Sequence, residues 1–289
     1  MNNTMQRSQP PHGALIRVSG ADCDAFLQGQ LSHDMRSLRP ESACLSSVNS
    51  PKGRVIATLV VCRLGADVGL LVAPDIAETL CQRLRMFVLR SKVSLEVDRD
   101  TTVTGWIATA TEADEHGAND WQCQAMGDAL WLRAPGARPR WWCIGPTSGD
   151  APSDVDDQAF ALADIACGLP CIGQVQSDAH IAQHLGLQRF DALSFSKGCF
   201  TGQEVIARLH YRGGINRTAV RLRGAQQPPP PGTVITDGDG KTLAEVVNSA
   251  ACAAGHEALA VWRGADAPAC IDTREAHWDV IDFDPPRPA

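Results

Sequence analysis

The chain has 289 residues, of which 44% are hydrophobic, and a formal net charge of −7 at pH 7. This composition excludes a disordered chain and allows two or three globular domains, while the acidic balance argues against unselective binding of nucleic acid. The first ten residues are polar, and the longest largely apolar run, residues 55–62, is too short to span a bilayer. The 11 Cys include no C-x-x-C pair and no zinc-spaced Cys/His group. We therefore expect free thiols, no metal site, no membrane contact and a cytoplasmic protein.

The first part of the chain alternates between strand and helix patterns. Ser19-Gly20-Ala21-Asp22 resembles a capping box, which marks the start of a helix. Gly65-Ala66-Asp67 separates two runs rich in apolar and β-branched residues and is typical of a hairpin turn. We expect, in order, strand 15–18, a helix ending near residue 29, hairpin strands 54–63 and 68–72, helix 74–88 and strand 92–97.

Shorter strands and polar breaks follow. Residues 111–120 and 148–157 are polar and predict loops, and Gly168-Leu169-Pro170 predicts the end of a helix. Four consecutive prolines in residues 226–232 predict a stiff connection. The expected elements are strands 103–108, 130–133 and 140–144, helix 160–166, and short strands of a small barrel in residues 234–282.

The segment with the strongest chemical signal is Lys197–Glu204. Thr201 and Glu204 fit the T-x-x-E pattern of a helix start. Cys199 then precedes a helix N-terminus and lies two residues from Lys197, and both features would lower the pKa of its thiol. Cys199 is thus the strongest candidate for a reactive thiol. The alternatives are a structural core cysteine and a cysteine hydrolase with His210 or His184 as base.

Positive charge is concentrated in Arg189–Arg223. This span holds seven cations and two anions, so its net charge is +5, and the remaining residues have a net charge of −12. A basic segment in an acidic protein predicts a site for an anionic partner. The equally plain interpretation is a solvated surface whose arginines pair with acids elsewhere in the chain.

Lys197–Glu204 also resembles the KGC[FY]TGQE signature of the YgfZ family. Weaker resemblances lie in Phe26–Gln30, Lys52–Arg54 and Ile165–Pro170, so that the similarity covers roughly residues 15–223. The family is similar in fold to the T-protein of the glycine cleavage system, an aminomethyltransferase. The resemblance implies an α+β, GcvT-like three-domain ring: a folate-binding domain in residues 12–50 and 150–218, a second α+β domain in residues 51–149, and a C-terminal antiparallel β-barrel in residues 219–285.

The resemblance further implies a function. It predicts a folate-binding accessory factor in iron–sulfur cluster assembly or repair, serving clients such as the enzymes that methylthiolate tRNA, rather than a conventional enzyme. Tetrahydrofolate is the expected ligand, and Cys199, tuned by Lys197, is the expected working thiol. The expected folate contacts are Phe160 as a stacking face, the amides of Gln28, Gln30 and Gln203, and the charged groups of Glu204, Arg208 and Arg212.

Two alternative functions stay open. The T-protein has an Asp pair in its hairpin strand where this chain has Ala57-Thr58, and neither side chain can be a carboxylate base. This departure argues against a folate-dependent one-carbon transferase. The other alternative is a tRNA-binding module that uses the Arg189–Arg223 segment, and its affinity would depend strongly on salt.

Overall fold

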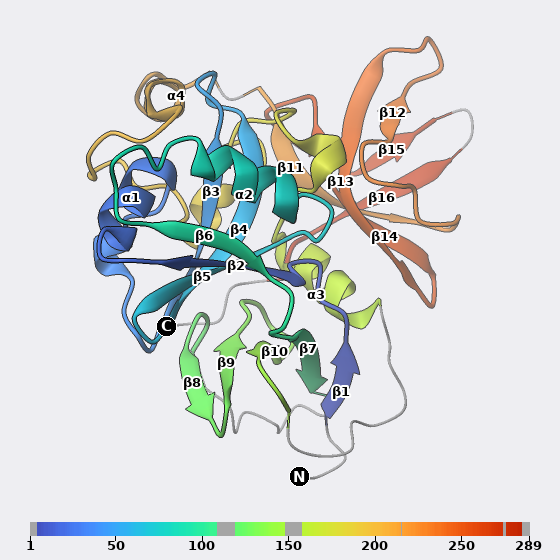
Figure 1. Cartoon of the computed structure of the whole chain (residues 1–289). Coiled ribbons are helices and arrows are strands. Elements are labelled where there is room, and N and C mark those ends of the chain that lie inside the picture. The colour runs from blue at the N-terminus through green and yellow to red at the C-terminus, as the bar shows by residue number, and fades with distance from the viewer. Residues whose placement is uncertain (1–4, 109–118, 148–157, 215, 274–275, 285–289) are drawn as a thin grey trace.

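The computed structural model describes residues 5–108, 119–147, 158–214, 216–273 and 276–284. In these ranges the strands form three antiparallel sheets, with four α-helices on and between them (Figure 1). The architecture is mixed, with few helices and many strands. Among the described residues, no helix is long and apolar enough to cross a membrane.

The first sheet is built from residues 14–98, in the order β3-β4-β5-β2-β6. Its elements are β2 (Ala14–Ser19), α1 (Cys23–Gln30), β3 (Ala43–Asn49), β4 (Val55–Leu64), β5 (Asp67–Val72), α2 (Ala77–Arg85) and β6 (Ser94–Asp98). A short 3₁₀ turn, η1 (Met35–Ser37), follows α1. The expected hairpin is β4–β5, paired from Val60–Leu71 to Leu64–Asp67.

Both faces of this sheet are buried. In β2, Leu15 faces one core cluster, whereas Ile16 and Val18 face another that also contains the apolar sides of α1 and α2. The same alternation holds in β4, where Val60 and Val61 enter different clusters. Because successive strand residues point to opposite faces, a strand covered on both sides is apolar throughout, which explains the long apolar run of β4.

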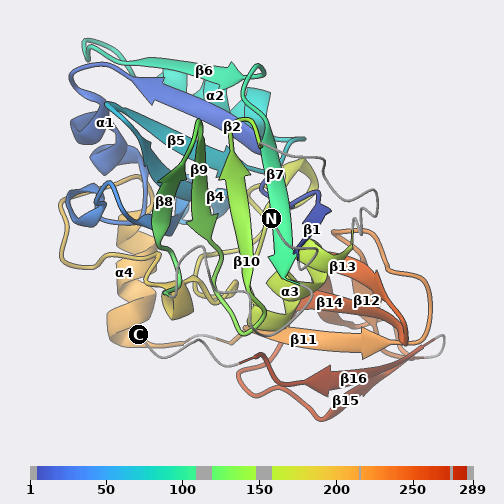
Figure 2. The ribbon, with the colours of Figure 1, turned by 90° about the horizontal axis from the view of Figure 1, so that it is seen from below.

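The second sheet covers the face of the first sheet opposite α1 and α2 (Figure 2). Its strands, in the order β1-β7-β10-β9-β8, are β1 (Met5–Ser8), β7 (Val103–Ala108), β10 (Arg140–Ile144), β9 (Ala129–Arg133) and β8 (Cys123–Met126). Trp142 faces the shared core and Trp141 the opposite side. The chain thus starts in this sheet, at β1, before it builds the first one.

The third sheet is formed by residues 218–281. Its order is β12-β13-β14-β11-β16-β15, with β11 (Thr218–Gly224), β12 (Val234–Thr236), β13 (Thr242–Cys252), β14 (Gly255–Trp262), β15 (Cys270–Asp272) and β16 (His277–Ile281). The remaining elements are α3 (Ala159–Cys167), η2 (Gln174–Gln176), η3 (Leu187–Phe190) and α4 (Gln203–Arg212). The described pairing leaves β12 and β15 as two ends, so this is a half-barrel sheet where a closed barrel was expected.

The expected domain boundaries differ from the sheet boundaries at one place. The boundary between residues 50 and 51 falls between β3 and β4, which pair with each other along their length. Along the chain, the last strand of the first sheet is instead β6, and the next strand, β7, belongs to the second sheet. Helix α3 ends at Gly168, which is left-handed (φ 77°), as the sequence predicts, and it lies against β7, β13 and β14. It therefore connects the second and third sheets.

Candidate functional site

The loop before α4 is held against the turn between β3 and β4. Gly202 has φ of 82°, and a Cβ added there would lie 2.5 Å from the Ser50 carbonyl oxygen and 3.0 Å from Gly53 Cα. Gly53 has φ of 72°, and its Cβ would lie 2.6 Å from Val205 Cβ. Only glycine fits such a left-handed, close approach. The structure thus joins two segments that the sequence places about 150 residues apart.

The predicted capping boxes are wrong at both helices. Helix α4 begins after Gly202, which has no side chain to accept a hydrogen bond, so Thr201 is not its cap. At α1 the N-cap is Asp22, whose carboxylate accepts instead from the Lys92 backbone N–H at 2.7 Å. In both places a tertiary contact determines how the helix starts. At its other end, α4 stops at Arg212 and Gly213 follows its last residue.

Lys197 joins the same loop to the end of α1. Its ammonium donates to the carbonyl oxygens of Leu31 at 2.7 Å and His33 at 2.8 Å, and it lies 5.2 Å from the centroid of the Phe200 ring. Burial lowers the pKa of Lys197 to about 8, because an ammonium loses hydration there. Within the described contacts, its ammonium is thus bound to backbone carbonyls and not to the Cys199 thiol.

Cys199 is exposed in this loop. All 11 Cys lie in the described ranges and are free, eight of them buried, with only Cys199 and Cys270 exposed and Cys252 in between. Burial raises the pKa of all eight buried thiols. Exposure to solvent therefore distinguishes Cys199 from most other thiols, and its role as a working thiol stays a prediction.

Two predicted folate contacts have structural partners instead. The Gln28 amide donates to Asp34 Oδ1 at 3.0 Å and accepts from the Met35 N–H at 2.8 Å, which holds the turn after α1. Phe160 is fully buried, 5.4 Å from the Trp142 ring and 5.4 Å from the Arg140 guanidinium. Its ring therefore has no free face for a ligand, which corrects the expected stacking role.

The basic segment divides into two parts. Arg221 and Arg223 both pair with Glu257 in the third sheet, and Arg221 also pairs with Asp284. These cations fit the plainer interpretation, in which arginines pair with acids elsewhere. On α4, by contrast, Arg208 and Arg212 are exposed, as is Glu204. Gln203 and Gln30 are partly buried.

A cavity of about 520 Å³ lies where segments of the first two sheets meet the chain around α3, η3 and the end of the third sheet. Asp120 and Trp121 come from the chain before β8, Arg189 and Phe190 from η3, and Asp284 from the chain after β16. None of the nine side chains predicted as site residues lines it. The structure thus separates the cavity from the predicted site residues.

Polar and aromatic groups in the cavity wall have an arrangement suited to binding. The Arg189 guanidinium lies 4.3 Å from the centroid of the Phe283 ring, and Gly168 leaves room for it, since a Cβ there would lie 2.6 Å from Arg189 Nη1. Asp120 accepts from the Gly136 N–H at 3.2 Å through Oδ2, while Oδ1 is buried with no hydrogen-bond partner among the described residues. The Trp121 ring is stacked on Trp142, 6.2 Å between centroids. A carboxylate oxygen, a cation and an indole thus share one cavity.

Comparison with known proteins assigns the chain to a family. No family model matches the chain. An uncharacterized protein of Haemophilus influenzae is 31% identical over 205 residues, which cover 70% of this chain and 68% of that protein. The tRNA-modifying protein YgfZ of Edwardsiella ictaluri is 28% identical over 232 residues, covering 74% and 70%, and that of Enterobacter sp. is 29% identical over 231 residues, covering 73% and 69%. The chain belongs to the YgfZ family.

A solved structure supports the fold of this YgfZ-family chain. The glycine cleavage system aminomethyltransferase T from Bartonella henselae superposes with a TM-score of 0.77, covering 97% of this chain and 86% of that one, at 15% sequence identity. At this identity the similarity establishes the fold alone. The GcvT-like fold predicted from the sequence is therefore confirmed, whereas the three-domain ring and the closed barrel stay predictions.

Sequence reasoning missed the cavity residues. Asp120 ends the polar run 111–120, which the sequence predicts to be a loop, and Trp121 follows that run directly. The available signal was a lone Trp at the end of a polar stretch. Arg189 was counted only as the first cation of the basic segment, because nothing in the sequence shows that it lies beside Phe283.

Proposed function

We propose that this YgfZ-family chain is a folate-binding accessory factor that supports iron–sulfur enzymes, including those that modify tRNA. The observation that carries the proposal is the cavity in which Asp120, Trp121 and Arg189 meet. Relatives named tRNA-modifying protein YgfZ support the assignment to tRNA modification. We propose the three-domain ring with a C-terminal barrel as part of the same assignment, together with the domain division expected above except for its boundary at residues 50 and 51, which separates the paired strands β3 and β4.

The cavity fits tetrahydrofolate chemically. Asp120 Oδ1, which has no partner within the described parts of the chain, would accept from N–H groups on the edge of the pterin, since an ionised carboxylate only accepts hydrogen bonds. Trp121, stacked on Trp142, would offer an aromatic face to the pterin. The Arg189 guanidinium suits the carboxylates of the glutamate tail. When bound, tetrahydrofolate supplies a carrier for one-carbon units.

The loop around Cys199 would provide the second part of the function. Its thiol is exposed, and the loop is fixed at both ends by the contacts of Lys197 and Gly202. We propose that Cys199 is the working thiol and that it acts toward a client protein, with Arg208 and Arg212 on the neighbouring surface of α4. Direct folate contacts by Gln30, Gln203 or Glu204 remain part of the proposal to be tested.

An aminomethyltransferase-like one-carbon transferase is the alternative enzyme function. Ala57 and Thr58 are both fully buried. Thr58 Oγ1 donates to the Pro170 carbonyl at 2.9 Å and accepts from the Ile172 N–H at 2.9 Å. This position therefore serves packing between β4 and the segment after α3, and it supplies no carboxylate. The accessory role is favoured for this reason.

A tRNA-binding module is the alternative based on α4. Tyr211 is 72% exposed there and lies next to Arg212, and His210 stacks on Phe195 at 3.8 Å between centroids. Exposed aromatic and cationic side chains on one helix suit stacking on RNA bases together with phosphate contacts. A salt-dependent affinity for tRNA that is lost in an Arg208→Gln/Arg212→Gln double variant would favour this alternative.

The deciding experiment is a calorimetric titration of the full chain with tetrahydrofolate. The wild type should bind saturably, and Arg189→Gln should weaken binding by about 10- to 100-fold, the loss expected for one charge-assisted hydrogen-bond pair. Arg90→Gln is the matched control, because Arg90 is exposed and outside the cavity lining, and its affinity should equal that of the wild type. Cys199→Ser should also bind normally.

Two results would contradict the proposal. Absence of saturable binding by the wild type would remove the folate assignment altogether. Binding that is unaffected by Arg189→Gln and weakened by Arg208→Gln would move the folate site from the cavity to α4, which holds four of the seven contacts predicted from the sequence.

A further inference from the structure

The hairpin of β15 and β16 places four side chains with metal-binding groups on one surface. Cys270 pairs with Asp279, and Asp272 pairs with His277, in antiparallel register. The intervening residues Ile271 and Trp278 are buried in the core of the third sheet. Because side chains alternate along a strand, these two buried residues fix the other four on the outer face, where all four are exposed.

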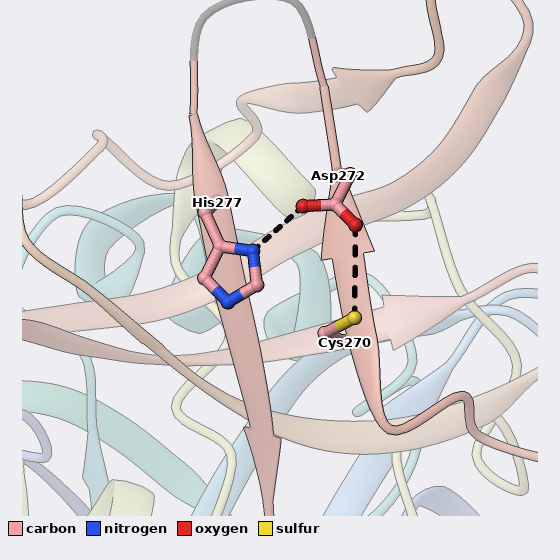
Figure 3. Close-up of side chains that lie close together, drawn as sticks. All are labelled: Cys270, Asp272 and His277. Atoms are coloured by element: carbon pink, nitrogen blue, oxygen red, sulfur yellow. Dashed lines mark hydrogen bonds and ion pairs between the residues drawn. The ribbon is translucent and has the colours of Figure 1, made fainter.

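Three of these side chains converge (Figure 3). The ligand atoms of Cys270, Asp272 and His277 all lie within 4.8 Å of one another. His277 Nδ1 is 2.6 Å from Asp272 Oδ1, and Cys270 Sγ is 3.7 Å from Asp272 Oδ2. Asp272 thus lies between the thiol and the imidazole, with one carboxylate oxygen toward each.

We propose that Cys270, Asp272 and His277 form a surface site for a divalent transition-metal ion of the Zn²⁺ type. A thiolate, an imidazole and a carboxylate form a ligand set that suits Zn²⁺ and related ions, whereas Mg²⁺ and Ca²⁺ take oxygen ligands. Three protein ligands leave a fourth tetrahedral position for water or for a group from a partner. The site lies apart from the cavity and from the loop of Cys199, and it does not depend on the function proposed above.

The present distances need little change to accept such an ion. Tetrahedral bonds of about 2.3 Å to sulfur and about 2.0–2.2 Å to nitrogen and oxygen place neighbouring ligand atoms about 3.4–3.6 Å apart. The separation of Cys270 Sγ from Asp272 Oδ2 is already 3.7 Å. The contact of Asp272 with His277 is a hydrogen bond of 2.6 Å, and it would open by less than about 1 Å. Exposed side chains can make this change by rotation alone.

Asp279 has a positioning role in this site. Its Oδ1 lies 3.2 Å from His277 Nε2, on the side of the ring away from Asp272. A carboxylate there accepts a hydrogen bond from the Nε2–H group, which fixes the tautomer with the lone pair on Nδ1 free to bind the ion, as in the carboxylate–histidine–metal arrangement. The strand register produces this arrangement directly, because Asp279 follows His277 by two residues on the same face.

The test is a titration of chelator-treated full-length protein with Co²⁺, a spectroscopic substitute for Zn²⁺, followed by Zn²⁺ competition. We expect one ion per chain and a thiolate-to-cobalt charge-transfer absorption band. Cys270→Ser should abolish that band, and His277→Ala should weaken Co²⁺ binding by at least tenfold. Asp279→Asn should weaken it by about 10- to 100-fold without abolishing the band, because Asp279 acts through His277. Cys199→Ser, which changes the other exposed thiol, is the matched control and should bind as the wild type does.

The outcomes separate the proposal from adventitious binding. Binding of Co²⁺ with no charge-transfer band, or a band that survives in Cys270→Ser, would overturn the proposal. A band lost in Cys199→Ser would assign the ion to the loop before α4 instead. Fluorescence and circular dichroism of each variant verify that Trp278 and the third sheet remain packed, so that a loss of binding is a loss of ligand.

Discussion

Gly53 and Gly202 meet backbone to backbone, so closely that a Cβ on Gly202 would lie 3.0 Å from Gly53 Cα. Both have positive φ. This contact joins the β3–β4 turn to the start of α4, and it fixes one end of the exposed loop that contains Cys199. The position of that loop thus depends on two residues without side chains.

The first prediction concerns this contact. Gly202→Ala should lower the free energy of unfolding by about 2–4 kcal/mol, because it combines left-handed strain with overlap against Ser50 and Gly53. Urea unfolding measures the change. Gly198→Ala in the same loop is the control, since a Cβ there meets nothing within 4 Å, and its effect should stay within about 0.5 kcal/mol. Equal effects of the two changes would show that the contact does not constrain the loop.

The second prediction concerns thiol access. A thiol reagent added to the native protein should modify Cys199 and Cys270 rapidly and Cys252 more slowly, because only the first two are exposed. The eight buried thiols should react only after unfolding, when all 11 become available. Cys199→Ser and Cys270→Ser should each remove one fast equivalent. Fast modification of more than three thiols would show that the cores open readily.

The third prediction concerns alkaline pH. Burial raises the folded-state pKa of eight thiols, for example Cys23 to about 11 and Cys123 to about 12. The pKa of an unfolded, solvated thiol is near 9.0, so above that pH the folded state holds more protons than the unfolded state. This contribution to stability is therefore complete below about pH 9 and is lost as the pH rises toward the folded values. Lys197 has the opposite effect on the pH dependence of stability, because its pKa is lowered in the folded state, but it is one group against eight thiols.

Urea unfolding at pH 7 and pH 10 tests this expectation. The free energy of unfolding should be lower at pH 10. Cys143→Ala removes a thiol whose pKa burial raises to about 12, and this variant should show a smaller loss between the two pH values. The same loss in both proteins would contradict the assignment to buried thiols.

The fourth prediction concerns acid. His12 is fully buried, and burial lowers its pKa from 6.5 to about 3. Between these values the unfolded state binds a proton that the folded state does not, so the stability present above pH 6.5 is lost as the pH falls toward 3. One such group changes the free energy by up to about 1.4 kcal/mol per pH unit. Burial raises the pKa of Asp164 to about 6, which opposes this loss of stability in acid. Burial lowers the pKa of His184 to about 4, which adds to the loss.

His12→Gln isolates the contribution of this residue. Between pH 7 and pH 5 the wild type should lose about 2 kcal/mol more stability than the variant, as measured by urea unfolding at both pH values. The His12 ring nitrogen Nδ1 is buried with no hydrogen-bond partner in the described ranges, so a proton on that nitrogen meets no acceptor there. Parallel losses in the two proteins would show that His12 is protonated in the folded state.

The metal-binding hairpin shows where a search of sequence spacing fails. Cys270, Asp272, His277 and Asp279 form no short Cys/His pair, so a search for zinc spacing passes over them. The alternation of buried and exposed residues in two short strands contains the signal, but only their register brings Cys270 near His277. Pairing across strands is a property of the sheet, because it depends on which residues face each other.

Local patterns in the sequence determined several elements. The long apolar run of β4, the Gly-Ala-Asp turn before β5, and the Gly168 and Gly213 helix ends follow from side-chain alternation and from the φ angles that glycine allows. The eight residues Lys197–Glu204 also sufficed to predict the family. These features need only neighbours along the chain, and so the sequence alone was enough.

Other features depended on contacts between distant segments. Strand β3 lacks apolar alternation, because two of its buried residues, Ser46 and Ser47, are polar. Their hydroxyl groups are satisfied by hydrogen bonds to Ser32. Phe160 matched an expected stacking position, yet packing under Trp142 buries it completely. The cavity assembles Asp120 and Arg189 from segments almost 70 residues apart. Only the tertiary structure decides such sites, because burial and the direction of a side chain depend on what the rest of the fold places against it.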